Sequence, residues 1–491
     1  MTEHLPALQT VVPLLAAPFC VLLRRAALVR IFAVLVTWSC LGIAFSLLQQ
    51  VLAEGTISYS LGGWSAPLGI EYRVDVLNAY VLVLVATIAS VVIAFPLAGT
   101  ELRIPTRRHF LFYALFLLCL AGLLGITITG DIFNIFVFLE ISSLSAYALI
   151  GLGRDRRALT AAFSYLVMGT IGGTFILIGI GLVYQMTGTL NIVDLSVRLP
   201  PVLDTRTVWM AFAFLVVGTS IKLAAFPLHQ WLPNAYTFAP SIVASFLSAT
   251  ATKVAYYVLV RVIFTIFGVA FVFERIELSS LMLPLSLIAM AVGSLAAIYQ
   301  TNIKRLLAYS SIAQIGYMTL GLSLANLDGL TGGLVHLFNH GLIKGGLFLV
   351  VACVLSRVDS PRIEALRGLG RKMPLTMAAF VVGGLGLIGV PGTVGFVSKW
   401  FLVLGALDRG FYGVAFLILA SSLLAVIYIW RVVEIMYFQE GDATPERNDA
   451  PLSMLVPTWV LIGATVYFGL DTELTAGVAQ RAAEYLLGGA S

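Results

Sequence analysis

Long apolar segments recur along almost the whole chain, and they constrain its fold more than any other feature. Of the 491 residues, 60% are hydrophobic and only 11% are charged. An ordinary soluble protein has about 25% charged residues, because polar groups must cover its core. A helix that crosses a bilayer takes about 20 apolar residues. The pattern therefore predicts an all-α polytopic membrane protein without a large domain outside the membrane.

Fourteen segments are long and apolar enough to be predicted as transmembrane helices. They cover residues 5–23, 31–53, 74–98, 110–129, 131–152, 159–186, 207–227, 238–267, 278–300, 304–324, 329–356, 374–406, 411–437 and 452–470. The seventh helix is expected to continue past Pro227 as a short segment over 228–236, and 471–491 reads as an amphipathic tail.

The basic residues of the loops lie mostly on one side of the membrane. If successive loops alternate sides, one face carries 17 of the 29 Lys and Arg residues and the other carries 6. Cytoplasmic loops are enriched in Lys and Arg. The asymmetry predicts a bacterial-type inner-membrane protein with both termini on the outer, periplasmic side. It also explains the net charge of +5 without a nucleic-acid partner.

Two predicted helices, the seventh and the twelfth, are interrupted by Gly and Pro. The interruptions lie at 224–241 and 383–396, five helices apart. Interrupted helices at corresponding positions of two halves indicate an inverted repeat with an ion site at the breaks. Because Pro and Gly are common in membrane helices, the two breaks could also be unrelated. We expect two inverted five-helix repeats, formed by helices 4–8 and helices 9–13.

This division predicts four regions. They are an N-terminal three-helix region at 1–109, a first repeat at 110–267, a second repeat at 278–437, and a C-terminal helix and tail at 438–491.

Five ionisable residues lie inside the apolar helices: Glu140, Lys222, Lys253, Lys344 and Lys399. Each costs about 2.5–3.5 kcal/mol at mid-membrane even on the mildest scale. Together they would cost about 12–17 kcal/mol without compensation, more than a typical folding stability. We therefore expect them to face each other, polar groups or water inside the bundle.

Glu140 and Lys222 are the first candidate pair. Glu140 lies nine residues beyond Asp131, about 13 Å into its helix, and Lys222 lies just before the first break. A Lys–Glu pair whose spacing can change is a switchable proton-binding unit, whereas a fixed pair is only structural. Asp131 begins its helix, where the helix dipole favours a carboxylate. His229 follows the first break. Asp131 and His229 are both possible path or entrance residues.

Lys253 and Lys399 are further candidate proton sites. Lys253 has hydroxyl residues around it, which suits a water-lined path near the centre of the chain; hydroxyl-satisfied packing is the alternative. These hydroxyl residues are Ser245, Ser248, Thr250 and Thr252. Lys399 follows the second break, so it could receive or release a proton, unless it merely extends toward an interface.

His336, His340 and Lys344 are spaced four residues apart and line one helical stripe about 12 Å long. Steps of about 6 Å are too long for direct proton transfer, so water must bridge them. Histidine titrates near neutrality, which suits a proton relay. An HxxxH pair can bind zinc, but no acidic third ligand lies nearby in the sequence. We therefore predict no metal and no cofactor.

Five stretches of the sequence together resemble a known family. They are GDIFNIFVFLEISSLSAYALI, KLAAFPLHQWLPNAYTFAPSIVASFLSATATKVAYYVLVR, NIKRLLAYSSIAQIGYM, HLFNHGLIKGGLFL and GVPGTVGFVSKW. They look like the proton-translocating antiporter-like membrane subunits. That family includes the D-type subunit of Mrp-type Na⁺/H⁺ antiporters and related subunits of respiratory complex I and of energy-converting hydrogenases. The resemblance covers roughly residues 110–437.

The resemblance implies fourteen helices with two inverted repeats and broken helices 7 and 12. It implies that Glu140 and Lys222 form an input-side pair and that Lys399 is the terminal site. A central axis would run through Lys253, His336 and His340, and Lys344 matches the family's helix 11 lysine. Lysine at position 399 disfavours the family members that carry glutamate there. The PNAYTFAPS segment and the total length look most like the Mrp D-type subunit.

The expected function is proton translocation within a multisubunit antiporter for Na⁺ (or K⁺), embedded in the lipid bilayer with other membrane subunits. The alternative is a proton-pumping subunit of a complex I-type NADH:quinone oxidoreductase or a membrane-bound hydrogenase, in which case the chain would belong to an enzyme. A stand-alone transporter of organic solutes is disfavoured, because the breaks hold lysines and aliphatic residues rather than a solute site.

Overall fold

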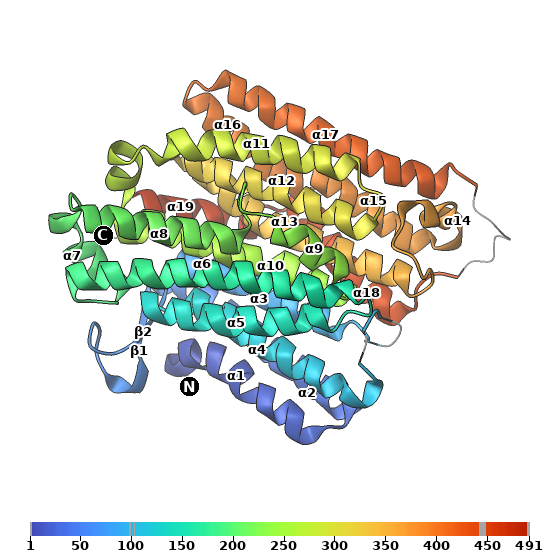
Figure 1. The fold of residues 1–491 in the computed structure, drawn as a ribbon, viewed down its shortest axis with the longest axis horizontal. Coiled ribbons are helices and arrows are strands. Elements are labelled where there is room, and N and C mark those ends of the chain that lie inside the picture. The colour runs from blue at the N-terminus through green and yellow to red at the C-terminus, as the bar shows by residue number, and fades with distance from the viewer. Residues whose placement is uncertain (1, 98–99, 103, 441–447, 489–491) are drawn as a thin grey trace.

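The computed structural model describes residues 2–97, 100–102, 104–440 and 448–488. In this part of the chain, long helices lie side by side along one common direction (Figure 1). The helices that form the predicted membrane spans are α1 (Leu5–Leu23), α2 (Ala26–Glu54), α3 (Val76–Ala94), α4 (His109–Ile128), α5 (Ile132–Gly151), α6 (Arg157–Thr187), α8 (Arg206–Leu223), α10 (Ser241–Val260), α11 (Leu278–Ile298), α12 (Ile303–Ser323), α13 (Leu327–Leu355), α15 (Pro374–Ile388), α16 (Val394–Asp408), α17 (Tyr412–Tyr437) and α18 (Leu452–Leu470).

The predicted fold class is confirmed. Twelve helices of the described chain are long and apolar enough to cross a membrane. Two further predicted spans fall below that limit for clear reasons: α12 carries buried polar residues such as Ser310 and Gln314, and the span of α15 and α16 is broken into two halves of 15 residues each.

Both predicted breaks are present. α8 ends at Leu223, and α9 (Trp231–Phe238) follows before α10 begins. The second break separates α15 from α16, with Gly389 at φ 86°. A broken helix leaves carbonyl groups without intrahelical partners. Trp231 Nε1 donates to Ile221 O at 2.9 Å, and Lys399 Nζ donates to Ile388 O at 2.7 Å. At each break, a side chain from the following segment satisfies a carbonyl of the first half.

A repeated hydrogen-bond pattern supports the inverted repeat. The start of α5 and a later loop exchange two backbone bonds: Ile132 N to Leu190 O and Ile192 N to Gly130 O. The start of α12 does the same with Ile303 N to Pro361 O and Ile363 N to Thr301 O. The first contact leads into α7 (Ile192–Arg198) and the second into α14 (Leu369–Lys372), which lie at opposite ends of the bundle (Figure 1). The four predicted regions themselves stay a prediction.

Several smaller elements were not predicted. The residues before α3 form an antiparallel hairpin of β1 (Ile57–Ser60) and β2 (Glu71–Val74), so the third span begins at Val76 rather than at 74. The eighth span ends in a π-helix over Arg261–Phe267. A second π-helix covers Ala270–Arg275, and a third, Glu473–Gly477, precedes α19 (Val478–Leu487). Short 3-10 turns cover Thr2–His4, Leu61–Gly63, Thr106–Arg108, Pro200–Val202 and Ile363–Leu366.

The tail is amphipathic, as predicted. Val478, Ala482 and Leu486 of α19 are buried, whereas Arg481 and Glu484 face outward. Tyr80 of α3 donates a hydrogen bond to Thr475 O, and the His4 ring contacts the Tyr59 hydroxyl in β1. The two ends of the described chain therefore lie at the same end of the bundle.

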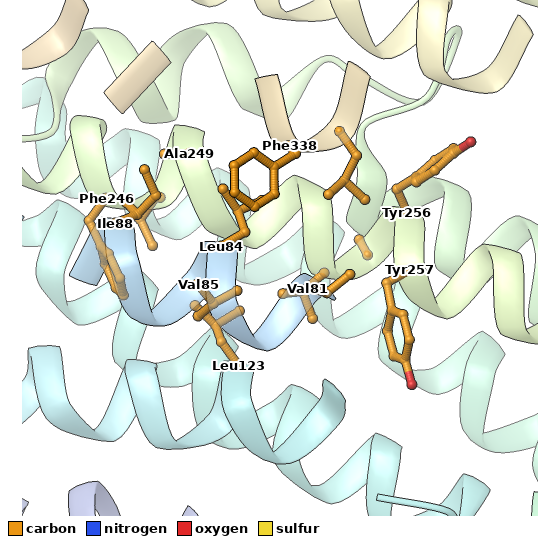
Figure 2. Close-up of a cluster of buried hydrophobic side chains, with 14 of the residues drawn as sticks. Val81, Leu84, Val85, Ile88, Leu123, Phe246, Ala249, Tyr256, Tyr257 and Phe338 are labelled. Atoms are coloured by element: carbon orange, nitrogen blue, oxygen red, sulfur yellow. The ribbon is translucent and has the colours of Figure 1, made fainter. Parts of the chain in front are cut away.

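The core centres on α13 and α10, in which nearly every residue is buried. Figure 2 shows Leu84 and Ile88 of α3 packed against Phe246 of α10 and Phe338 of α13. Because α10 and α13 also carry Lys253, His336, His340 and Lys344, the fold places these polar residues on its innermost helices.

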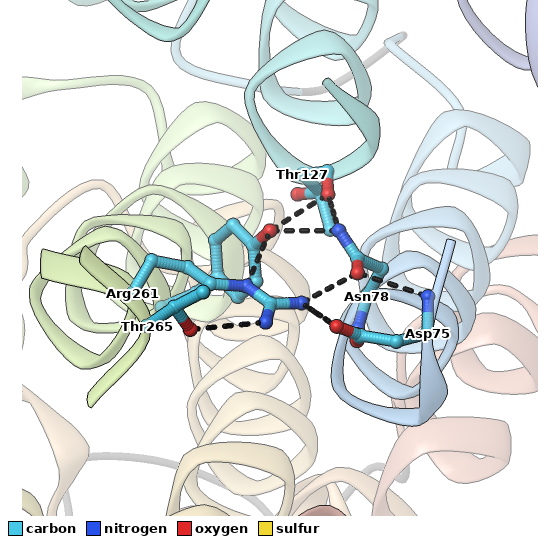
Figure 3. A network of polar contacts seen from close by, with 6 residues as sticks. Asp75, Asn78, Thr127, Arg261 and Thr265 are labelled. Atoms are coloured by element: carbon cyan, nitrogen blue, oxygen red, sulfur yellow. Dashed lines mark hydrogen bonds and ion pairs between the residues drawn. The ribbon is translucent and has the colours of Figure 1, made fainter. Parts of the chain in front are cut away.

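A buried ion pair ties α3 to the π-helical end of the eighth span (Figure 3). Arg261 donates to both carboxylate oxygens of Asp75 at 2.6 Å and to Asn78 Oδ1 at 2.5 Å. Asp75 also caps α3 by accepting from Asn78 N at 3.0 Å. The two charged side chains are only 5% and 3% exposed. Removing one partner would leave the other charge buried and uncompensated.

We expect Asp75→Ala to lower the free energy of unfolding by about 3–5 kcal/mol, because it strands the Arg261 guanidinium. Thermal unfolding of the detergent-solubilised protein measures this. Asp204→Ala is the control, because the Arg275–Asp204 pair is 52% and 82% exposed and should contribute little. Equal shifts for both variants would contradict the expectation.

Candidate functional site

Glu140 and Lys222 form the pair that the sequence predicts. Lys222 Nζ lies 3.3 Å from Glu140 Oε1 and 3.0 Å from Ser143 Oγ. Lys222 is 5% exposed and Glu140 is 28% exposed. Gly173 of α6 makes room for the carboxylate, since a Cβ there would collide with Glu140 Oε1. A role in proton transfer stays a prediction, but the geometry it requires is present.

A small cavity extends from Lys222 toward α10. Its volume is about 30 Å³, and its wall includes Ser142, Ser143, Lys222 and Ala251. That volume suffices for one water molecule, and the two hydroxyls and the ammonium offer it polar partners. The cavity therefore provides a bridging position between Lys222 and the helix that carries Lys253.

Lys253 and Lys344 are fully buried, and both donate hydrogen bonds to carbonyl and hydroxyl oxygens. Lys253 Nζ donates to Ser248 O at 2.5 Å and to Thr252 Oγ1 at 3.3 Å. Lys344 Nζ donates to Leu307 O at 2.7 Å and to Ser310 Oγ at 2.5 Å. Carbonyl and hydroxyl oxygens accept from an ammonium without neutralising it. The charge on each lysine therefore depends on its neighbours along the axis.

The two histidines stack on one face of α13. Their ring centroids are 5.9 Å apart, and His336 Nδ1 lies 2.8 Å from Ser398 Oγ. Among the described residues, His336 Nε2 and both ring nitrogens of His340 have no hydrogen-bond partner, although both rings are 1% exposed. Buried polar atoms are almost always paired with protein or ordered water. The orphaned nitrogens therefore favour the water-bridged relay that the spacing predicts.

Lys399 lies inside the protein rather than at an interface. Its Nζ donates to Leu387 O at 3.0 Å and Ile388 O at 2.7 Å, and it sits 4.8 Å from the centroid of the Tyr317 ring. Tyr317 in turn lies 5.4 Å from the His336 ring. Tyr317 and Ser398 thus join Lys399 to the histidines, although neither carries a charge that would mark it in the sequence.

The two possible path residues form no hydrogen bond to this axis within the described part of the chain. Asp131 caps α5 by accepting from Asn134 N at 2.7 Å. Burial raises the pKa of its carboxyl group, which lies just before the membrane span. His229 lies between α8 and α9 with its ring stacked 5.2 Å from Phe226. A place for either residue on the path stays a prediction.

The burial of Lys304, the first residue of the predicted span at 304–324, was not predicted. This lysine lies in the first turn of α12, is only 2% exposed, and pairs with Glu101 at 2.9 Å. The Arg261–Asp75 pair was also not predicted from the sequence.

Within the described residues, no group of three or more His, Cys, Asp or Glu side chains is placed to hold a metal.

Comparisons with known proteins identify the class. The family described as "NADH:quinone oxidoreductase/Mrp antiporter, TM" matches residues 129–427. The chain belongs to this family, as the five sequence stretches predict.

Individual relatives cover nearly the whole chain. NADH-quinone oxidoreductase subunit N of Desulforudis audaxviator is 41% identical over 490 residues, covering 96% of this chain and 97% of its own. The D-type subunit of the Bacillus subtilis Na⁺/H⁺ antiporter is 29% identical, covering 98% and 96%.

Solved structures share the fold. A chain of the archaeal membrane-bound sulfane sulfur reductase superposes with a TM-score of 0.91 at 30% identity, covering 99% of this chain and 98% of its own. A chain of the Mrp complex from Dietzia sp. gives 0.90 at 26% identity, covering 99% and 97%.

We expect Gly173→Ala to reduce proton transfer severalfold without removing any charge, because the new Cβ displaces Glu140 Oε1 from Lys222. Acidification of inverted membrane vesicles measures the rate. Gly181→Ala in the same helix is the matched control, since no atom lies within 4 Å of its added Cβ. Wild-type rates in both variants would contradict a role for the pair's geometry.

Proposed function

We propose that this chain is a proton-translocating subunit of a multisubunit membrane complex. The observation that carries the proposal is the Glu140–Lys222 ion pair beside the first break, in which Lys222 is buried and Glu140 is partly exposed. Further lysines and histidines are buried on α10, α13 and α16. These residues are Lys253, His336, His340, Lys344 and Lys399. Such a row is expensive inside a bilayer and marks an ion path.

The pair would act as the switch of the path. Glu140 stabilises the charged form of Lys222 at 3.3 Å. When the carboxylate is neutralised or moves away, Lys222 is left as a buried charge with a hydroxyl partner and favours release of its proton. The cavity beside Lys222 reaches α10, the helix that carries Lys253, at Ala251 and Val254. Repulsion between successive lysines would then move charge toward Lys399.

We propose that the complex is redox-driven rather than a cation/proton antiporter. The chain is 41% identical to the quinone oxidoreductase subunit and 29% identical to the antiporter subunit. The reductase chain also matches at a higher sequence identity than the Mrp chain, 30% against 26%. The similarity thus favours the alternative over the Mrp D-type subunit. An antiporter that exchanges Na⁺ or K⁺ for protons is the second candidate.

One face of α5 supports the need for a partner subunit. Glu140 is 28% exposed on a helix stripe that also holds Phe133, Val137 and Leu144, which are 42%, 37% and 57% exposed. A partly exposed carboxylate at mid-membrane would meet lipid. We propose that a neighbouring membrane subunit covers this stripe.

The distribution of basic residues in the loops further supports a location in a bacterial-type inner membrane, with both termini on the outer side.

Glu140→Gln and Lys222→Met should each lower proton translocation by about tenfold or more, because each removes one member of the proton-binding pair. The rate is measured in vesicles that hold the assembled complex. Full translocation in both variants would contradict the proposed function.

Purification after mild detergent extraction separates the two candidate complexes. We expect iron–sulfur or nickel subunits to copurify with the chain. Copurification of small membrane subunits alone, with Na⁺-dependent proton movement, would instead identify an antiporter.

A further inference from the structure

A second, larger cavity lies away from the axis described above. It has a volume of about 670 Å³ and opens at the end of the bundle that the loop charges predict to be cytoplasmic. Charged and polar side chains line it, including Glu101, Arg154, Arg157, Asn302, Lys304 and Asp359. A cavity of this size and polarity holds many water molecules.

One ion pair separates this cavity from the interior. Lys304 Nζ lies 2.9 Å from Glu101 Oε1 and 2.5 Å from Ala239 O. The other carboxylate oxygen, Glu101 Oε2, accepts from Ser241 N at 2.7 Å and from the Ser241 hydroxyl. Lys304 is 2% exposed, whereas Glu101 is 27% exposed. Glu101 thus contacts both the cavity and the first residue of α10.

A stripe of hydroxyl groups continues from Ser241 along α10. Its members are Ser241, Ser245, Ser248 and Thr252, each at most 2% exposed. Their spacing of four, three and four residues places them on one helix face over about 17 Å. Ser248 Oγ donates to Ser245 O at 3.3 Å, and Lys253 Nζ donates to Ser248 O at 2.5 Å. Ser245 Oγ donates to Gly345 O of α13 at 2.7 Å, so water must bridge the steps between successive hydroxyls. The stripe leads from Glu101 toward the central lysine.

We propose that the 670 Å³ cavity is a proton-loading vestibule and that the Glu101–Lys304 pair is its gate. The Glu101 carboxylate takes a proton from cavity water and becomes a neutral acid, which weakens its attraction to Lys304. The protonated Glu101 side chain then passes this proton through water beside Ser241 and along the hydroxyl stripe to a neutral Lys253 amine. The Glu101 carboxylate is restored and pairs with Lys304 again. This inference rests on the proposed proton-translocating function.

A purely structural role for Glu101 is the competing explanation. Pro240, the N-cap of α10, provides no side-chain hydrogen bond, so Glu101 could simply cap this helix. The two roles are separable, because Gln at position 101 keeps an oxygen that accepts from Ser241 N but cannot take up and release a proton at neutral pH.

The test compares variants of the whole complex in vesicles. We expect Glu101→Gln to lower proton translocation by about tenfold, and Glu101→Asp to restore most of the rate. Ser241→Ala should cause a smaller loss, because water replaces its hydroxyl only in part. Asp359→Asn, at an exposed carboxylate of the same cavity, should match the wild type.

Glu140→Gln distinguishes a failure of the proposed gate from a failure of the proposed function. If it abolishes translocation while Glu101→Gln and Ser241→Ala keep the wild-type rate, the gate is overturned and the proposed function stands. If Glu140→Gln also keeps the full rate, the proposed function itself fails. Should Glu101→Gln prevent assembly, Ser241→Ala decides, and a wild-type rate in that variant overturns the gate.

Discussion

The cost of placing charge inside a lipid-embedded bundle controls the architecture of this protein. Each buried ammonium needs oxygen atoms around it, and most carbonyls of a regular helix are already paired within that helix. The structure provides these oxygens at helix breaks, on hydroxyl side chains, and at helix carbonyls that accept a second hydrogen bond, such as Ser248 O and Leu307 O. Lys399 binds carbonyls freed by the second break, and Lys222 binds Glu140 and Ser143 beside the first. The interrupted helices are therefore part of the charge stabilisation.

Burial without full neutralisation gives the site its chemical character. The central lysines have carbonyl and hydroxyl partners, and three of the four ring nitrogens of His336 and His340 have no hydrogen-bond partner in the described part of the chain. Groups in such surroundings change charge when a neighbour does, whereas a closely matched pair such as Arg261–Asp75 holds its charges and stabilises the fold. The same protein thus contains buried charges of two kinds, and the number of partners distinguishes them.

α10 connects these features across the membrane. It begins at the Glu101–Lys304 pair, carries the hydroxyl stripe and Lys253 in its middle, and continues into the π-helix of Arg261. The two-bond pattern at the starts of α5 and α12 recurs at opposite ends of the bundle, which supports the predicted inverted repeat. The chain's relatives belong to complexes with different reactions, an NADH-quinone oxidoreductase and an Na⁺/H⁺ antiporter.

The sequence predicted the Glu140–Lys222 pair from the cost of leaving either charge alone inside the membrane. By itself it determined the spans, the two breaks and the helices that carry charge. These depend on local properties, since the length of an apolar run and the cost of a charge within it are read along the chain. Only the tertiary structure decided that Lys304 is buried, that Glu101 contacts α10, and that Tyr317 lies between Lys399 and His336. Asp75 and Arg261 are 186 residues apart, and no periodicity links them. Such contacts arise from how helices pack, and packing brings together residues whose separation in sequence carries no signal.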